Sequence, residues 1–146
     1  MILAQQIAPL LAGKDWGIGG SLLLWKLGIE PRPNDLDIMT TAAHFGVVSR
    51  PLEEKFGAGV RTPHPAFRSA HFARFSTDAG VSIDLFAGVR VERGGQSSSW
   101  NFDPRSVLEW RGLPWMRPAD WLELYELFDR PERVSALRRY LAARAT

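Results

Sequence analysis

The feature that most constrains the fold is a strand, a turn and a helix followed by a second strand, between residues 15 and 39. Residues 15–18 predict a short strand, and the turn Gly19-Gly20-Ser21 follows directly. We expect Ser21 to cap a helix over residues 22–27, because serine hydroxyls accept hydrogen bonds from the N–H groups of a first turn. Two prolines then force an extended connection to residues 35–39, whose alternating polar and apolar side chains predict a half-buried strand.

The rest of the chain predicts helices at both ends and antiparallel strands in the middle. A helix is expected before Gly13, and another over residues 49–56 with Ser49 as its cap. The strands of two predicted hairpins cover residues 70–75, 81–86, 89–92 and 98–102. Pro118 and Pro131 each begin a helix, which gives a C-terminal helical segment over about residues 118–144. This order predicts an α+β fold in a single domain, residues 1–146.

Composition narrows the chemistry that the chain can carry out. There is no cysteine among the 146 residues, which excludes disulfides, thiolate zinc sites and cysteine nucleophiles. The 3 histidines have no metal-binding helical spacing, so a metal ion would have to be a hard cation held by carboxylates. The formal net charge is only +2 and there is no basic stripe, which argues against a nucleic-acid-binding module.

The basic residues are nearly all arginine, the exceptions being Lys14, Lys26 and Lys55. Arginine forks suit phosphate and carboxylate groups, although a GC-rich genome would favour arginine as well, and both explanations stay open. No stretch is apolar enough to cross a membrane, so no membrane partner is expected. Residues 1–13 lack the basic region of a signal peptide, and we therefore expect a cytoplasmic protein.

The turn at Gly19, Gly20 and Ser21 is a candidate phosphate site. Two glycines let the backbone approach a ligand closely, and the beginning of a helix presents N–H groups to an anion. The serine hydroxyl could add a further donor. A tight turn capped by serine, with no ligand, is the plainer interpretation of the same residues.

Three aspartates are candidate metal ligands. Asp35 and Asp37 are two residues apart on a predicted strand, so their carboxylates are expected to point to the same side. Like charges so close repel one another unless a cation lies between them, and Mg²⁺ prefers few carboxylates together with water and phosphate. Asp84 lies on the polar side of a later strand, and would complete a cluster if the two strands were neighbours. Solvated acids on exposed strand faces remain the alternative.

These motifs, in this order, resemble the nucleotidyltransferase superfamily related to DNA polymerase β. Its signature is a Gly-Ser turn that begins a helix, an Asp-x-Asp strand, and a single Asp on a later strand. Residues 16–38 are similar to small bacterial members, including aminoglycoside-nucleotidyltransferase-like and minimal antitoxin-type proteins. The resemblance implies a mixed or antiparallel sheet flanked by helices, with the C-terminal helices packed against it.

The resemblance also implies a two-metal site for phosphoryl transfer. Asp35 and Asp37 would hold Mg²⁺ or Mn²⁺ against a nucleoside triphosphate, while Asp84 would complete the ligands and act as general base. Gly19, Gly20 and Ser21 would hold the phosphates. The product would be a small-molecule hydroxyl or a protein side chain that carries a nucleoside monophosphate.

One segment departs from the family pattern. Many relatives have an Arg-x-Lys-Asp-like sequence at the start of a C-terminal helix, where this chain has Arg130-Pro131-Glu132-Arg133. Arg133 could replace the lysine as a phosphate partner, but a planar fork is not equivalent to a point charge. This departure favours the alternative of a catalytically weak or inactive relative that binds nucleotide, or that binds a partner protein as an antitoxin does.

Other aromatic and basic residues carry weaker hypotheses. The tryptophans at 100, 110, 115 and 121 could stack on a base, but core packing or an oligomer contact is the better interpretation. A basic rim of histidines and arginines between residues 61 and 74 is better explained as a solvated loop and strand edge. The second wall of the site could come from the C-terminal helices or from a second copy of the chain in a homodimer.

Overall fold

The computed structural model describes residues 1–30, 32, 33, 35–61 and 69–145. The α-helices within these ranges are α1 (Ile2–Ile7), α2 (Gly20–Lys26), α3 (Phe45–Phe56), α4 (Pro118–Leu127) and α5 (Pro131–Arg144). Short 3₁₀ helices are η1 (Ala8–Leu11), η2 (Ala42–His44) and η3 (Pro104–Ser106). The strands are β1 (Gly17–Gly19), β2 (Leu36–Met39), β3 (Ser69–Ser76), β4 (Ser82–Arg93), β5 (Gln96–Trp100), β6 (Leu108–Trp110) and β7 (Leu113–Trp115).

The described strands form one mixed sheet in the order β3-β4-β2-β1-β7-β6, and β5 extends it by pairing with β4. β4 pairs with three strands, since it is parallel to β2 and antiparallel to both β3 and β5. Farther along the sheet, β1 is antiparallel to β2 and parallel to β7. The predicted α+β fold, a mixed sheet flanked by helices, is confirmed.

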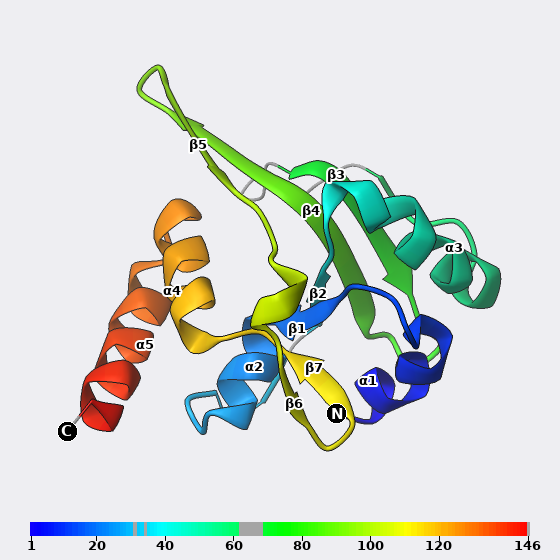
Figure 1. Cartoon of the computed structure of the whole chain (residues 1–146), viewed down its shortest axis with the longest axis horizontal. Helices are drawn as coiled ribbons and strands as arrows, with labels where there is room; N and C mark the ends of the chain where they lie inside the picture. The colour runs from blue at the N-terminus through cyan, green and yellow to red at the C-terminus, as the bar shows by residue number, and fades with distance from the viewer. Residues whose placement is uncertain (31, 34, 62–68, 146) are drawn as a thin grey trace.

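The helices cover the sheet on two faces (Figure 1). Phe45 of α3 stacks on His71 of β3, with ring centroids 5.2 Å apart, so α3 covers the face to which the odd-numbered side chains of β3 point. Trp121 of α4 packs edge-on against Phe86 of β4 on the opposite face. Residues 83–87 of β4 are buried without interruption, as expected for a strand that is covered on both sides.

Three details of the predicted elements are wrong. Ser21 does not cap α2, which begins at Gly20 after Gly19 as N-cap. The helix expected to begin at Ser49 begins at Phe45 instead, because Thr41 caps the 3₁₀ turn η2, which continues directly into α3. The strands expected at 81–86 and 89–92 are the single strand β4.

The continuity of β4 depends on Gly88. Its φ of 63° is a conformation that glycine adopts easily, so the strand can bend there without ending. β4 pairs with β3 along its first part and with β5 along its last part, where the hairpin projects beyond the sheet (Figure 1). In the described part of the chain, no helix is both long and apolar enough to cross a membrane.

We expect Leu85→Ala to lower the free energy of unfolding by about 2–5 kcal/mol, because the lost side chain would leave a cavity in the core. Leu85 lies on β4 and is 0% exposed. Leu108→Ala on the edge strand β6 is the matched control, since Leu108 is 60% exposed and its truncation should cost under about 0.5 kcal/mol. Urea unfolding of both variants measures this difference, and equal losses would contradict the assigned core.

Candidate functional site

Four polar or glycine positions form a row across four adjacent strands. The strand register pairs Gly19 of β1 with Asp37 of β2, Asp37 with Asp84 of β4, and Asp84 with Arg74 of β3. Paired positions on neighbouring strands point to the same face of a sheet. The row lies on the face that α4 covers, because Trp121 of α4 occupies the space directly above Gly19.

Asp84 is bound on both oxygens by Arg74. Arg74 Nε donates to Asp84 Oδ1 over 2.7 Å, and Arg74 Nη2 donates to Asp84 Oδ2 over 2.9 Å. The Asp84 side chain is only 7% exposed, so this charge-assisted fork replaces the water that burial removes. The hydrogen bond to Asp84 raises the pKa of Arg74, which therefore keeps its charge.

Asp37 lies between the other two acids and is the most perturbed group of the site. Burial, then the charge of Asp84, then that of Asp35 raise its pKa from 3.8 to about 8, while Arg133 and Arg74 act in the opposite direction. Among the described residues, no hydrogen-bond donor or ion-pair partner reaches the Asp37 carboxylate. The charged form of the Asp37 carboxylate is thus disfavoured, and a bound cation would stabilise it.

Asp35 lies in a bend just before β2, whereas the sequence predicted it on the strand. Its Oδ1 accepts a hydrogen bond from the backbone N–H of Ser82, at 3.1 Å, which continues the pairing between β2 and β4. One Asp35 oxygen is therefore engaged by the backbone of the neighbouring strand. Its effect on the pKa of Asp37 shows that the two charges still act on one another.

The donor set fits one hard cation and not a three-carboxylate cluster. Within the ranges that the structure describes, no three His, Asp or Glu side chains are arranged to hold a metal ion. The Arg74 fork occupies both oxygens of Asp84, so Asp37 and the second oxygen of Asp35 are the remaining candidate ligands. Two carboxylates with water and phosphate oxygens are a coordination that Mg²⁺ commonly takes.

The glycine turn is shaped by its neighbours. Gly20 has a φ of 61°, and a Cβ atom at this position would overlap the Asp37 carboxylate. A Cβ atom on Gly19 would overlap the indole of Trp121. Ser21 is buried, and its hydroxyl donates to the backbone oxygen of Asp35 over 3.3 Å. Both glycines are thus required by close approach, and the turn lies directly against Asp37.

The C-terminal helices contribute two residues near the site, Tyr125 from α4 and Arg133 from α5. Arg133 Nη1 donates to the Tyr125 hydroxyl over 3.0 Å, and its guanidinium lies 5.4 Å from the centre of the Tyr125 ring. The charge of Arg133 also acts to lower the pKa of Asp37, which indicates that the guanidinium lies near the Asp37 carboxylate. Burial raises the pKa of Tyr125 to about 12, so its hydroxyl stays neutral and can donate a proton in a hydrogen bond.

Some sequence hypotheses do not assemble at this row. Arg61 pairs with Glu53 of α3, and His71 stacks on Phe45, so both lie with α3 on the other face of the sheet. Residues 64 and 68 of the suggested rim lie outside the described residues. Of the four tryptophans, 115 and 121 are core residues, as the plainer interpretation predicted.

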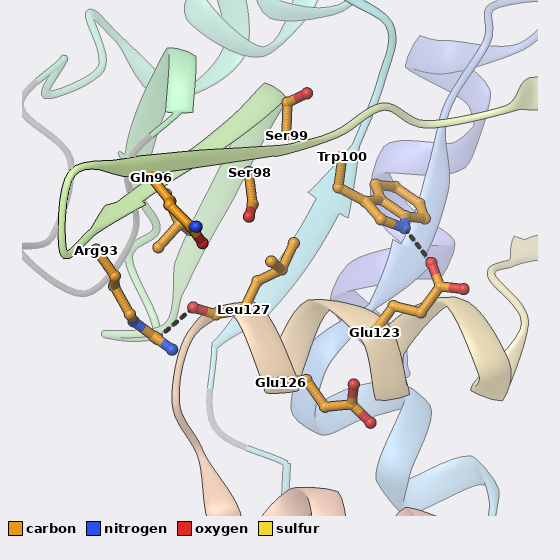
Figure 2. A pocket seen from close by; sticks show the side chains of 9 residues that line it. Arg93, Gln96, Ser98, Ser99, Trp100, Glu123, Glu126 and Leu127 are labelled. Carbon is orange, nitrogen blue, oxygen red and sulfur yellow. Dashed lines mark hydrogen bonds between the residues drawn. The ribbon is translucent and has the colours of Figure 1, made fainter.

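A separate hollow of about 460 Å³ lies between the β4–β5 hairpin and α4 (Figure 2). Two hydrogen bonds cross it: Trp100 Nε1 donates to Glu123 over 2.8 Å, and Arg93 donates to the backbone oxygen of Leu127. These contacts attach the hairpin to α4. The same helix therefore carries Tyr125 toward the aspartates and Glu123 toward the hairpin.

The pairing of Arg74 with Asp84 is not among the sequence predictions, although the sequence contains a signal for it. The turn predicted at residues 77–80 is real, and the Thr77 N–H donates to the Val81 oxygen over 3.1 Å. Continuing that hairpin outward places Arg74 opposite Asp84. The position of Tyr125 over the site had no comparable signal, because it depends on how α4 packs on the sheet.

A comparison with solved structures supports the fold. A protein from Thermotoga maritima, TM1012, whose crystal structure is described as that of a "putative nucleotidyltransferase", superposes with a TM-score of 0.69 at 21% sequence identity. The match covers 97% of this chain and 92% of that chain. The chain therefore has the nucleotidyltransferase-like fold. No family model matches the sequence, and no curated protein matches it either.

We expect ionisation of Asp37 to lower the stability of the metal-free protein as the pH rises from about 4 to about 8. The folded pKa of about 8 exceeds the ordinary value of 3.8, so the folded state binds more protons than the unfolded chain over this window. The contribution of Asp37 to stability is highest below pH 3.8 and falls as the pH rises to about 8. Asp37→Asn should therefore raise Tm more at about pH 8.5 than at about pH 5.

Thermal unfolding in the presence of a chelator measures this effect. Asp78→Asn is the matched control, because Asp78 is exposed in the turn between β3 and β4 and should show no such dependence. An equal gain in Tm for Asp37→Asn at both pH values would contradict the raised pKa.

Proposed function

We propose that the chain transfers a nucleoside monophosphate from a nucleoside triphosphate to a hydroxyl group. The observation that carries the proposal is the row of Gly19, Asp37, Asp84 and Arg74 across adjacent strands, which combines a close-approach turn with carboxylates and a cation. The nucleotidyltransferase-like fold, with a neighbour described in those terms, supports it. The cytoplasm, which supplies nucleoside triphosphates, is the location that we propose.

In this proposal the chain's residues divide into phosphate, cation and acceptor contacts. Gly19, Gly20 and Ser21 hold the phosphates at the start of α2, where backbone N–H groups meet an anion. Arg133 and the neutral Tyr125 hydroxyl approach from the C-terminal helices, as a charged fork and a hydrogen-bond donor.

The cation is proposed to be Mg²⁺ or Mn²⁺, held by Asp35 and Asp37. When bound, it would neutralise charge on the phosphates as pyrophosphate leaves. Asp84 accepts the proton of the acceptor hydroxyl as the oxygen–phosphorus bond forms and the bond to pyrophosphate breaks. Arg74 keeps Asp84 oriented on the same face as Asp37.

Gly20→Ala should abolish Mg²⁺-dependent binding of nucleoside triphosphates. The added methyl group would overlap the Asp37 carboxylate and displace it. Gly28→Ala is the matched control, because Gly28 also has a positive φ (79°) but a Cβ atom there meets nothing within 4 Å. Isothermal titration with each triphosphate separates the two variants, and similar binding by both would contradict the role of the turn.

A mass-spectrometric screen tests the transfer itself. We expect a candidate hydroxyl-bearing acceptor, small molecule or protein, to gain the mass of AMP, GMP, CMP or UMP in the presence of Mg²⁺. Asp84→Asn should reduce the rate by about 10²–10⁴-fold, the usual contribution of a general base. Absence of adducts across a broad panel, together with intact nucleotide binding, would refute transfer.

One observation favours a second candidate function. Both oxygens of Asp84 are engaged by Arg74, and this is the arrangement expected if the acid no longer takes part in catalysis. The chain would then be a nucleotide-binding relative that acts on a partner protein, as an antitoxin does. Nucleotide binding by the wild-type chain without transfer to any acceptor distinguishes this function from the first.

A further inference from the structure

We propose that the Arg74 guanidinium takes the place of a second metal ion, so that the site binds a single divalent cation. This inference rests on the proposed function and narrows it. One cation would be held by Asp35 and Asp37. The third carboxylate, Asp84, would stay paired with the Arg74 guanidinium.

The sheet geometry builds the Arg74–Asp84 pair into the fold. The backbone N–H and C=O of Arg74 exchange hydrogen bonds of 2.9 Å with Val60, so they point away from β4. Arg74 and Asp84 are therefore a non-hydrogen-bonded pair of the antiparallel ladder, the type in which side chains lie closest. The fork of 2.7 Å and 2.9 Å is what this register produces.

Burial and charge oppose replacement of Arg74 by a metal ion. The Asp84 side chain is 7% exposed, whereas that of Arg74 is 37% exposed, so the fork closes the acid from solvent. A divalent cation bound to Asp84 would lie against a guanidinium of the same sign. Removing the guanidinium instead would leave a buried carboxylate without its partner, which proteins rarely tolerate.

The remaining donors suit one cation. Among the described residues, Asp37 has no hydrogen-bonding partner for its carboxylate, and one oxygen of Asp35 is engaged by Ser82. These two carboxylates, with water and phosphate, match the ligands of one Mg²⁺ ion. One divalent cation and Arg74 together balance the charge of the three acids.

Counting bound Mn²⁺ ions tests the inference without any assay of activity. We expect an electron paramagnetic resonance titration with Mn²⁺ alone to give one ion per wild-type chain. Arg74→Gln frees Asp84 and should raise the count to two ions per chain. Arg74→Lys keeps the positive charge beside Asp84 and should restore a count of one.

Two further variants make the test specific. Arg50→Gln is the matched control, because the Arg50 side chain on α3 is 82% exposed and pairs with Glu54 at the surface, so the count should stay at one. Asp84→Asn should also bind one ion, since Asp84 is not a ligand in this arrangement; this variant decides the question if Arg74→Gln does not fold by circular dichroism.

The ion counts distinguish a failure of this inference from a failure of the proposed metal site. Two ions on the wild-type chain, one ion on folded Arg74→Gln, or loss of the ion in Asp84→Asn would each overturn the role of Arg74 while leaving a metal site in place. No bound Mn²⁺ on the wild-type chain would overturn the metal site itself, and the inference with it.

Discussion

The register of β4 between β2 and β3 is the constraint on which the rest of the structure depends. Because side chains alternate along a strand, the pairing of Asp84 with Asp37 on one side and Arg74 on the other places all three on one face. A slip of one residue would turn Asp84 toward the α3 face and into apolar surroundings. The buried charge pair therefore favours this register over a slipped one.

The same row shows how a fold can hold a destabilised group. Burial and two neighbouring acids disfavour the charged form of Asp37, and Arg74 is already paired with Asp84. The apolar core around β4 supplies the stability that lets this carboxylate persist in an unfavourable place. Such an arrangement is typical of functional sites, where local cost is tolerated because a ligand relieves it.

The sequence was sufficient for features that depend on local pattern and insufficient for those that depend on packing. Alternation and turn residues predicted the α+β order, the turn at residues 77–80 and the helices beginning at Pro118 and Pro131, all of which the structure contains. The start of α3 was missed because an earlier 3₁₀ turn extends it. The partner of Asp84 and the position of Tyr125 depend on which strands and helices meet, information that no short motif carries.

The contact between Gly19 and Trp121 joins the glycine turn to α4. The indole fills the volume that any side chain at position 19 would need, although more than a hundred residues separate the two positions. The glycine turn and α4 are consequently not independent modules. In a chimaera that exchanges the C-terminal helices, the incoming helix must bring a side chain of matching bulk, and a larger residue at position 19 becomes acceptable only if position 121 shrinks in compensation.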